Sequence, residues 1–210
     1  MRASASAAVV IFCLLPPVVA TEEPVTVNPH LQEVVKLPAC LKGKTFYVGE
    51  IAGRAENSSV ATAHSTTSPT PSWLPVSGVI LGRQFTVESI NWQRDPREIV
   101  REAVADSFES AGALTKDEAL ADYSLSINLR QFGFVEATWR EYYSKLEMTV
   151  TLKNQKTGAL AEVLAFGTAV VNKQDGRKRI AQATQSGLEI ALRRAVANFL
   201  YSAKLKTAVE

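Results

Sequence analysis

The fold is decided between residues 95 and 171, a stretch that opens with DPREIVREAVADSFESAG (95–112) and continues through YSLSINLR (123–130) and LEMTVTL (146–152). Asp95 offers a side-chain acceptor directly before a proline and three residues before a glutamate, which is typical of a helix N-terminus. Apolar residues then recur at spacings of three and four, with charged residues between them. We therefore predict an amphipathic helix that ends near Gly112. Its apolar face should comprise Ile99, Val100, Ala103, Val104, Ser107, Phe108 and Ala111.

Two segments after this helix alternate in the manner of strands. Apolar residues occupy the odd positions of 123–130 and the even positions of 146–152, as expected of strands with one buried face. The alternation changes phase at Phe132 and Phe134. A β-bulge at Gly133, or the end of the strand, would explain the change. The alternative leaves both aromatic residues on the outer face as a docking patch.

Residues 160–171 follow a Lys156-Thr-Gly158 turn signal and are rich in alanine and valine, which predicts a third strand. A last helix is expected over residues 177–203, with a long stripe of small apolar residues. Strands joined by short turns form an antiparallel meander. The predicted fold is therefore α+β, with an antiparallel sheet of four to five strands and two amphipathic helices packed on one face.

The N-terminal half has the organisation of an exported protein. Residues 1–20 combine one positive charge, an apolar run and a small-residue end at Ala20, which predicts a signal peptide cleaved there. We expect an extended linker over 21–43, a single domain over 44–203 and a tail over 204–210. Strands are predicted at 44–51 and 85–92, and a long loop rich in Ser, Thr and Pro at 54–75.

Cysteine and charge restrict the possible functions. Cleavage would leave Cys40 as the only cysteine, so no intramolecular disulfide would be possible. The preceding Leu37-Pro-Ala matches a lipidation pattern, but the segment before it is polar, so a partly buried thiol is the favoured interpretation. The whole chain carries 23 basic and 21 acidic residues, and this near balance does not favour nucleic acid as a partner.

Several segments resemble known envelope proteins. Residues 95–104, 108–112, 121–125 and 151–158, followed by a C-terminal helix, are similar to YajG-like lipoproteins and to auxiliary lipoproteins of ABC-type lipid transporters in Gram-negative bacteria. The Tyr142-Tyr143 pair with the 156–158 turn is similar to lipoprotein activators of penicillin-binding proteins, which share a fold with the N-terminal domain of TolB. This resemblance implies a periplasm-facing domain that binds envelope partners without chemistry of its own. The chain departs from these families because Thr21, and not a cysteine, follows the signal peptide.

We expect no enzymatic site, cofactor or metal. The two histidines, His30 and His64, have no cysteine or carboxylate cluster at ligand spacing, and the Asp117-Glu118 pair is expected in a solvated loop. The expected function is that of a periplasmic envelope accessory protein, with outer-membrane association left open. Alternatives are an auxiliary subunit of a lipid transporter and a periplasmic hydrolase with an unrecognised site. Predicted partner contacts are Trp73, Phe132, Phe134 and Trp139; predicted contacts to anions such as phospholipid or peptidoglycan are Lys173, Arg177, Lys178 and Arg179.

Overall fold

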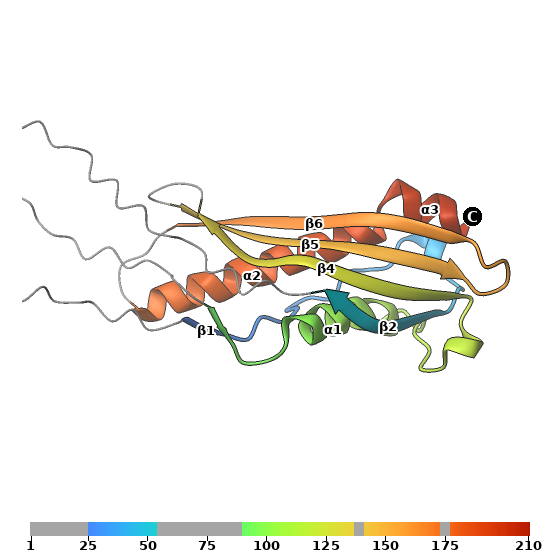
Figure 1. Cartoon of the computed structure of the whole chain (residues 1–210), viewed down its shortest axis with the longest axis horizontal. Coiled ribbons are helices and arrows are strands. Elements are labelled where there is room, and N and C mark those ends of the chain that lie inside the picture. Colours follow the sequence, from blue (N-terminus) through green and yellow to red (C-terminus); the bar gives the residue numbers. More distant parts are fainter. Residues whose placement is uncertain (1–24, 54–89, 137–140, 173–176) are drawn as a thin grey trace, which may run out of the picture.

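The computed structural model describes residues 25–53, 90–136, 141–172 and 177–210 (Figure 1). Its helices are α1 (Pro96–Glu109), α2 (Arg177–Leu200) and α3 (Ala203–Val209), with two short 3-10 helices, η1 (Ala39–Leu41) and η2 (Glu118–Leu120). Its strands are β1 (Val25–Val27), β2 (Phe46–Gly53), β3 (Ile90–Trp92), β4 (Tyr123–Glu136), β5 (Glu141–Asn154) and β6 (Leu160–Asn172).

The main sheet has four strands in the order β2-β4-β5-β6. Its β4-β5-β6 part is the predicted antiparallel meander. The prediction of a wholly antiparallel sheet is wrong, because β2 runs parallel to β4, with Phe46 opposite Tyr123. The chain between them passes through α1, and a connection through a helix brings the next strand back in the same direction. The separate pair of β1 and β3 is also parallel.

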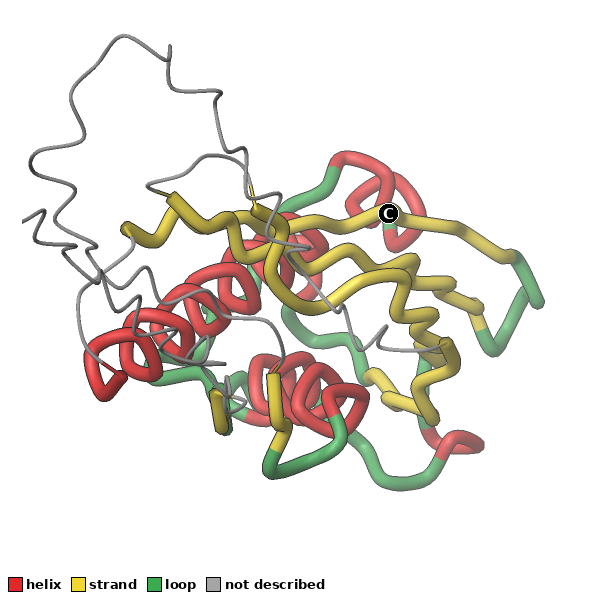
Figure 2. Tube along the Cα trace, turned by 60° about the vertical axis from the view of Figure 1, so that its left-hand side comes forward, coloured by secondary structure: helices red, strands yellow, loops and turns green. Residues whose placement is uncertain are grey.

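The helices α1 and α2 lie on one side of this sheet (Figures 1 and 2). Six of the seven residues predicted for the apolar face of α1 are buried. The seventh, Ala111, is exposed because the helix ends at Glu109, and the left-handed φ of +66° at Gly112 turns the chain. At the other end, the Asp95 side chain accepts a hydrogen bond from the Arg97 N–H, as a capping residue does.

The strand β4 contains the irregularity that its sequence indicated, but at a different residue. The pairing with β5 shifts between Leu129 and Gln131, so the bulge lies three residues before Gly133. The extra residue turns Phe132 to the inner face, where it is fully buried and its ring centroid lies 4.9 Å from that of Trp92. The docking-patch alternative is therefore wrong for Phe132.

Both segments expected outside the domain pack onto its core. In the predicted linker, β1 and the segment after it bury Val25, Val27, Val35, Leu37 and Leu41. The predicted tail forms α3 and buries Leu205 and Val209. Val25 and Val27, and Val35 and Leu37, are two residues apart, and Leu205 and Val209 are four apart, but each run is too short for periodicity alone to predict an element. The predicted loop at 54–75 lies outside the described residues, as does the predicted strand before Ile90.

The carboxylate of Asp122 links the segment before β2, the segment before β4 and the turn between β5 and β6. Asp122 accepts hydrogen bonds from the Thr45 N–H at 3.0 Å, the Thr45 hydroxyl at 3.0 Å and the Lys156 ammonium at 2.9 Å. The hydrogen bond from Lys156, followed by those from Thr45, lowers the pKa of Asp122 from 3.8 to about 2. All three bonds favour the charged form, so Asp122 stabilises the fold only while it is ionised.

This arrangement predicts an acid-sensitive contribution to stability. Because the folded pKa is the lower one, the contribution is complete above about pH 4 and is lost as the pH falls through about 2. The Asp122 side chain is 30% exposed, so we expect Asp122→Asn to cost only about 1 kcal/mol at pH 7. Urea unfolding at pH 7 and pH 2 measures the effect. The difference in the free energy of unfolding between variant and wild type should be smaller at pH 2 than at pH 7. An equal difference at both pH values would contradict the role of Asp122.

Candidate protein-binding surface

One face of the main sheet carries exposed apolar side chains along its edge strand β6. Leu160, Leu164, Phe166 and Val170 are 69%, 50%, 52% and 53% exposed. We call these four residues the β6 strip. The residues between them, such as Val163 and Ala165, face the helices and are buried, so the strip lies on the opposite, outer face. Among the described residues, half of the exposed large hydrophobic side chains belong to this strand.

Charged residues border the strip on the outer face. Lys145 and Glu147 of β5 form an ion pair at 2.8 Å, and Arg130 of β4 lies 3.6 Å from Glu147. The hydrogen bond from Lys145 lowers the pKa of Glu147, although partial burial opposes the shift. Glu147 is paired directly with Phe166 across the strands. The outer face therefore combines apolar side chains at its edge with two basic residues and one acidic residue beside them, a composition found at protein interfaces.

A polar atom beneath the strip has no partner of its own. Thr149 is 6% exposed, and its side-chain oxygen makes no hydrogen bond within the described part of the chain. It is paired with Leu164 of β6. A buried hydroxyl without a partner is costly, so Thr149 reduces the stability of this part of the sheet.

The sequence did not reveal this strip. Residues 160–171 are apolar at both odd and even positions, a pattern that by itself fits a strand buried on both faces. Only the sheet order shows that β6 is an edge strand, and only the placement of the helices shows that its even positions are uncovered. Phe166 is the largest residue of the strand, which was the one available signal.

Only one predicted partner contact can be placed with its side chain. Phe132 is buried and cannot contact a partner in this fold. Trp73 and Trp139 lie outside the described residues. Phe134 of β4 is paired with Ser144 of β5, but the position of its side chain is not described. The predicted contacts to anions cannot be placed either. Lys173 lies outside the described residues. The first three residues of α2 are Arg177, Lys178 and Arg179, and the positions of their side chains are not described.

Other residues singled out in the sequence have local partners. Cys40 lies in η1, is half-buried and packs against the core. Asp117 caps η2 by accepting from the Ala119 N–H at 2.9 Å. The Glu118 carboxylate accepts from the Gln155 amide at 3.0 Å. The two carboxylates of the predicted loop thus have structural contacts.

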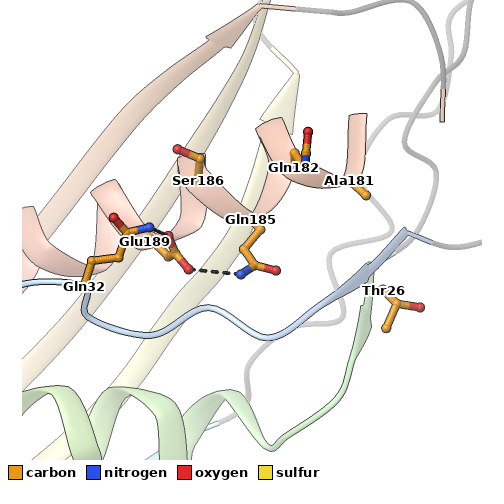
Figure 3. A pocket seen from close by; sticks show the side chains of 7 residues that line it. All are labelled: Thr26, Gln32, Ala181, Gln182, Gln185, Ser186 and Glu189. Atoms are coloured by element: carbon orange, nitrogen blue, oxygen red, sulfur yellow. Dashed lines mark hydrogen bonds between the residues drawn. The ribbon is translucent and has the colours of Figure 1, made fainter. Parts of the chain in front are cut away.

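A small pocket lies between α2 and the N-terminal segment (Figure 3). It has a volume of about 260 Å³ and is lined by Ala181 and by polar side chains of both elements. Glu189 of α2 is 7% exposed and accepts hydrogen bonds from Gln32 at 2.8 Å and Gln185 at 3.1 Å. The His30 imidazole nitrogen lies 3.5 Å from the same carboxylate. Glu189 therefore ties the N-terminal segment to the helix, since a buried carboxylate needs such donors.

Removing this carboxylate should loosen the N-terminal segment. We expect Glu189→Ala to cost about 1–3 kcal/mol, because the amides of Gln32 and Gln185 lose their acceptor. Hydrogen exchange around residues 28–36 should accelerate in the variant. Glu33→Ala is the matched control, because the ion pair of Glu33 with Arg193 is exposed on both sides and contributes little. Equal exchange in both variants would contradict the anchoring role of Glu189.

Within the described ranges, we found no group of three or more His, Cys, Asp or Glu side chains that could hold a metal ion. None of the helices in the described part of the chain is long and apolar enough to cross a membrane.

Comparisons with known proteins show the fold of the chain and do not assign it to a family. No family model matches the sequence, and no curated protein matches it. Among solved structures, a protein from Xanthomonas campestris assigned to family DUF330 superposes with a TM-score of 0.60 and 18% identity, covering 87% of this chain and 96% of its own.

Two further solved structures are more distant. A putative lipoprotein from Caulobacter crescentus CB15 has a TM-score of 0.40 and 19% identity, covering 52% of this chain and 80% of its own. A PelC dodecamer from Paraburkholderia phytofirmans has a TM-score of 0.39 and 14% identity, covering 80% and 95%. The superposition with a TM-score of 0.60 shows that the chain has the α+β fold of the DUF330 protein.

Proposed function

We propose that this chain is an accessory protein of the Gram-negative cell envelope that acts by binding another protein through the β6 strip. The uncovered apolar strip is the observation that carries the proposal. Soluble monomers rarely leave a continuous apolar patch of several hundred Å² facing water unless it contacts a partner. Leu164 and Phe166 are neighbours on this face, while Glu162 and Thr168 separate them from Leu160 and Val170; all four apolar side chains are half exposed or more.

We also propose that the chain catalyses no reaction. The predicted acid pair is used for local structure, since Asp117 caps η2 and Glu118 accepts from Gln155. The buried Glu189 is held by two amides in a structural role. The outer face carries apolar side chains next to charged ones, a composition that suits contact with a protein surface.

The envelope location rests on the sequence. The predicted signal peptide would export the chain, and residues 95–104, 108–112, 121–125 and 151–158 resemble envelope lipoproteins. We propose a periplasmic form that begins after Ala20. Intact mass of the protein recovered from the periplasm tests this directly, because retention of the first 20 residues or an added lipid would each change the mass.

Substitution of the strip tests the binding function. We expect Leu164→Asp with Phe166→Asp to abolish recovery of partner proteins from a Gram-negative envelope extract, because two charges would be desolvated in the contact. The matched control is Ser126→Asp with Asn128→Asp, which adds the same charge to exposed positions of β4 on the same face. The control should recover every partner. Recovery by the β6 variant as well would overturn the proposed function.

A further inference from the structure

We propose that the free edge of β6 binds an extended segment of the partner protein, which joins the main sheet as a fifth strand. This inference rests on the proposed function and states how the partner is held. The β6 strip consists of side chains on the outer face, whereas this proposal concerns the backbone N–H and C=O groups at the edge of the sheet. Added strands of this kind bind through main-chain hydrogen bonds.

The two edges of the main sheet differ in their protection. Edge strands are normally kept from pairing with other chains by short length, bulges, prolines or charges. The strand β2 has only eight residues and a register break between Val48 and Ile51. The strand β6 has 13 residues, one charged residue at Glu162, no proline, and unbroken pairing with β5. Among the described residues, the obstacles at this edge are α3, which lies beside Ala161 and Glu162 at the start of β6, and Arg194, which binds the Thr168 carbonyl. Between these two points, from Val163 to Gly167, none of the usual obstacles is present in the described part of the chain.

Hydrogen bonds show which backbone groups of β6 face outward. Next to the strand, the Ala159 carbonyl accepts from the Asn154 N–H of β5 at 2.9 Å, which assigns the odd positions to the pairing with β5. The Thr168 carbonyl instead accepts from the Arg194 guanidinium at 2.6 Å. Since the N–H and C=O of one residue point the same way in an antiparallel ladder, the even residues, including Leu164 and Phe166, direct their backbone groups toward the free edge.

The helix beneath β6 favours a single strand over a second copy of the chain. Packing there is so close that a Cβ atom on Gly167 would lie 2.0 Å from the Ala191 carbonyl oxygen. A second copy paired through its own β6 would bring its own α2 beneath the joined strands, beside the α2 that already packs on β6. Packed helices need ~8–10 Å between their axes. An isolated extended segment brings no helix and meets no such obstacle.

The edge also indicates the chemistry of the segment. Its residues on the outer face would lie beside Leu164, Phe166 and Val170, so alternate positions should be apolar and β-branched. Its own N–H groups must be free, which excludes proline there. Arg194 would have to release the Thr168 carbonyl to the incoming strand. An acidic residue near that end of the segment would give the guanidinium a new partner.

A defined peptide tests this mode of binding in the full exported protein. The probe is a blocked octapeptide of alternating valine and threonine ending in glutamate; its control carries N-methyl groups on alternate residues. We expect the probe to slow amide exchange at Leu164, Phe166 and Thr168 by about tenfold. Thr168→Pro, which removes an outward N–H, should weaken binding. Thr168→Ala, which keeps it, should not, and circular dichroism will confirm that both variants fold.

Three results would overturn the inference. The first is no protection of these amides by the probe. The second is equal binding of the N-methylated peptide, which would mean that side chains alone make the contact. The third is a dimer in sedimentation that Thr168→Pro dissociates, which would assign the edge to a second copy. None of these outcomes depends on the envelope extract, so the proposed function is judged separately by the aspartate variants of the strip.

Discussion

Replacing Gly167 with alanine is expected to destabilise the chain by about 3 kcal/mol or more. The new Cβ atom would lie 2.0 Å from the Ala191 carbonyl oxygen and 2.5 Å from the Ala195 nitrogen. Both atoms belong to the backbone of α2, so no side chain can rotate away to make room. The helix as a whole would have to separate from β6. Chemical denaturation of the purified protein measures the loss.

Gly112 provides a control that separates this clash from backbone strain. It has a φ of +66°, and no atom of the described residues lies within 4 Å of the place that a Cβ atom would take. Alanine there should therefore cost about 1–2 kcal/mol from the left-handed conformation alone. A Gly167→Ala variant as stable as Gly112→Ala would show that α2 does not pack on β6 at this distance.

The second large effect is expected at Phe46. Its ring lies 4.5 Å from that of Phe108 in α1 and 5.4 Å from that of Tyr123 in β4, measured between centroids. Phe46 is fully buried and joins the parallel strand β2 to both neighbours. We expect Phe46→Ala to cost about 3–5 kcal/mol, because it leaves a cavity among these rings. The midpoint of thermal or urea unfolding is the measurement.

Phe166→Ala is the matched substitution on the other face of the sheet. Because Phe166 is 52% exposed, its loss should change the stability of the isolated protein by less than about 1 kcal/mol. Comparable losses at Phe46 and Phe166 would mean that the outer face is covered in the folded chain, contrary to the structure.

Local patterns in the sequence were sufficient for the elements of the core. The capped helix at Asp95, the alternation over 123–130 and 146–152, and the third strand all follow from short-range periodicity, and each forms where it was predicted. The phase change before Phe132 correctly indicated a bulge, but periodicity cannot tell which residue of the run is the extra one. Pairing with β5 decides that, and it selects Arg130.

Features that depend on contacts between distant segments could not be predicted in this way. The parallel pairing of β2 with β4 joins residues 77 apart, Phe46 and Tyr123, and nothing local distinguishes it from an antiparallel neighbour. The N-terminal segment was interpreted as a linker because its apolar pairs, Val25 with Val27 and Val35 with Leu37, are too short to establish a strand. The β6 strip could not be predicted for a different reason: residues 160–171 carry apolar side chains at both odd and even positions, so the sequence does not indicate which face the helices will cover.

The central claim is that the outer face of β6 is free in the isolated chain and covered in the envelope. The rate at which a thiol reagent modifies Leu164→Cys, measured in purified protein and in intact cells, tests it most directly, with Asn128→Cys on β4 as the reference and the unaltered chain as the background for Cys40. We predict that position 164 is modified rapidly when purified and is protected in cells, whereas position 128 reacts equally in both. Equal reactivity of position 164 in the two settings would contradict the account.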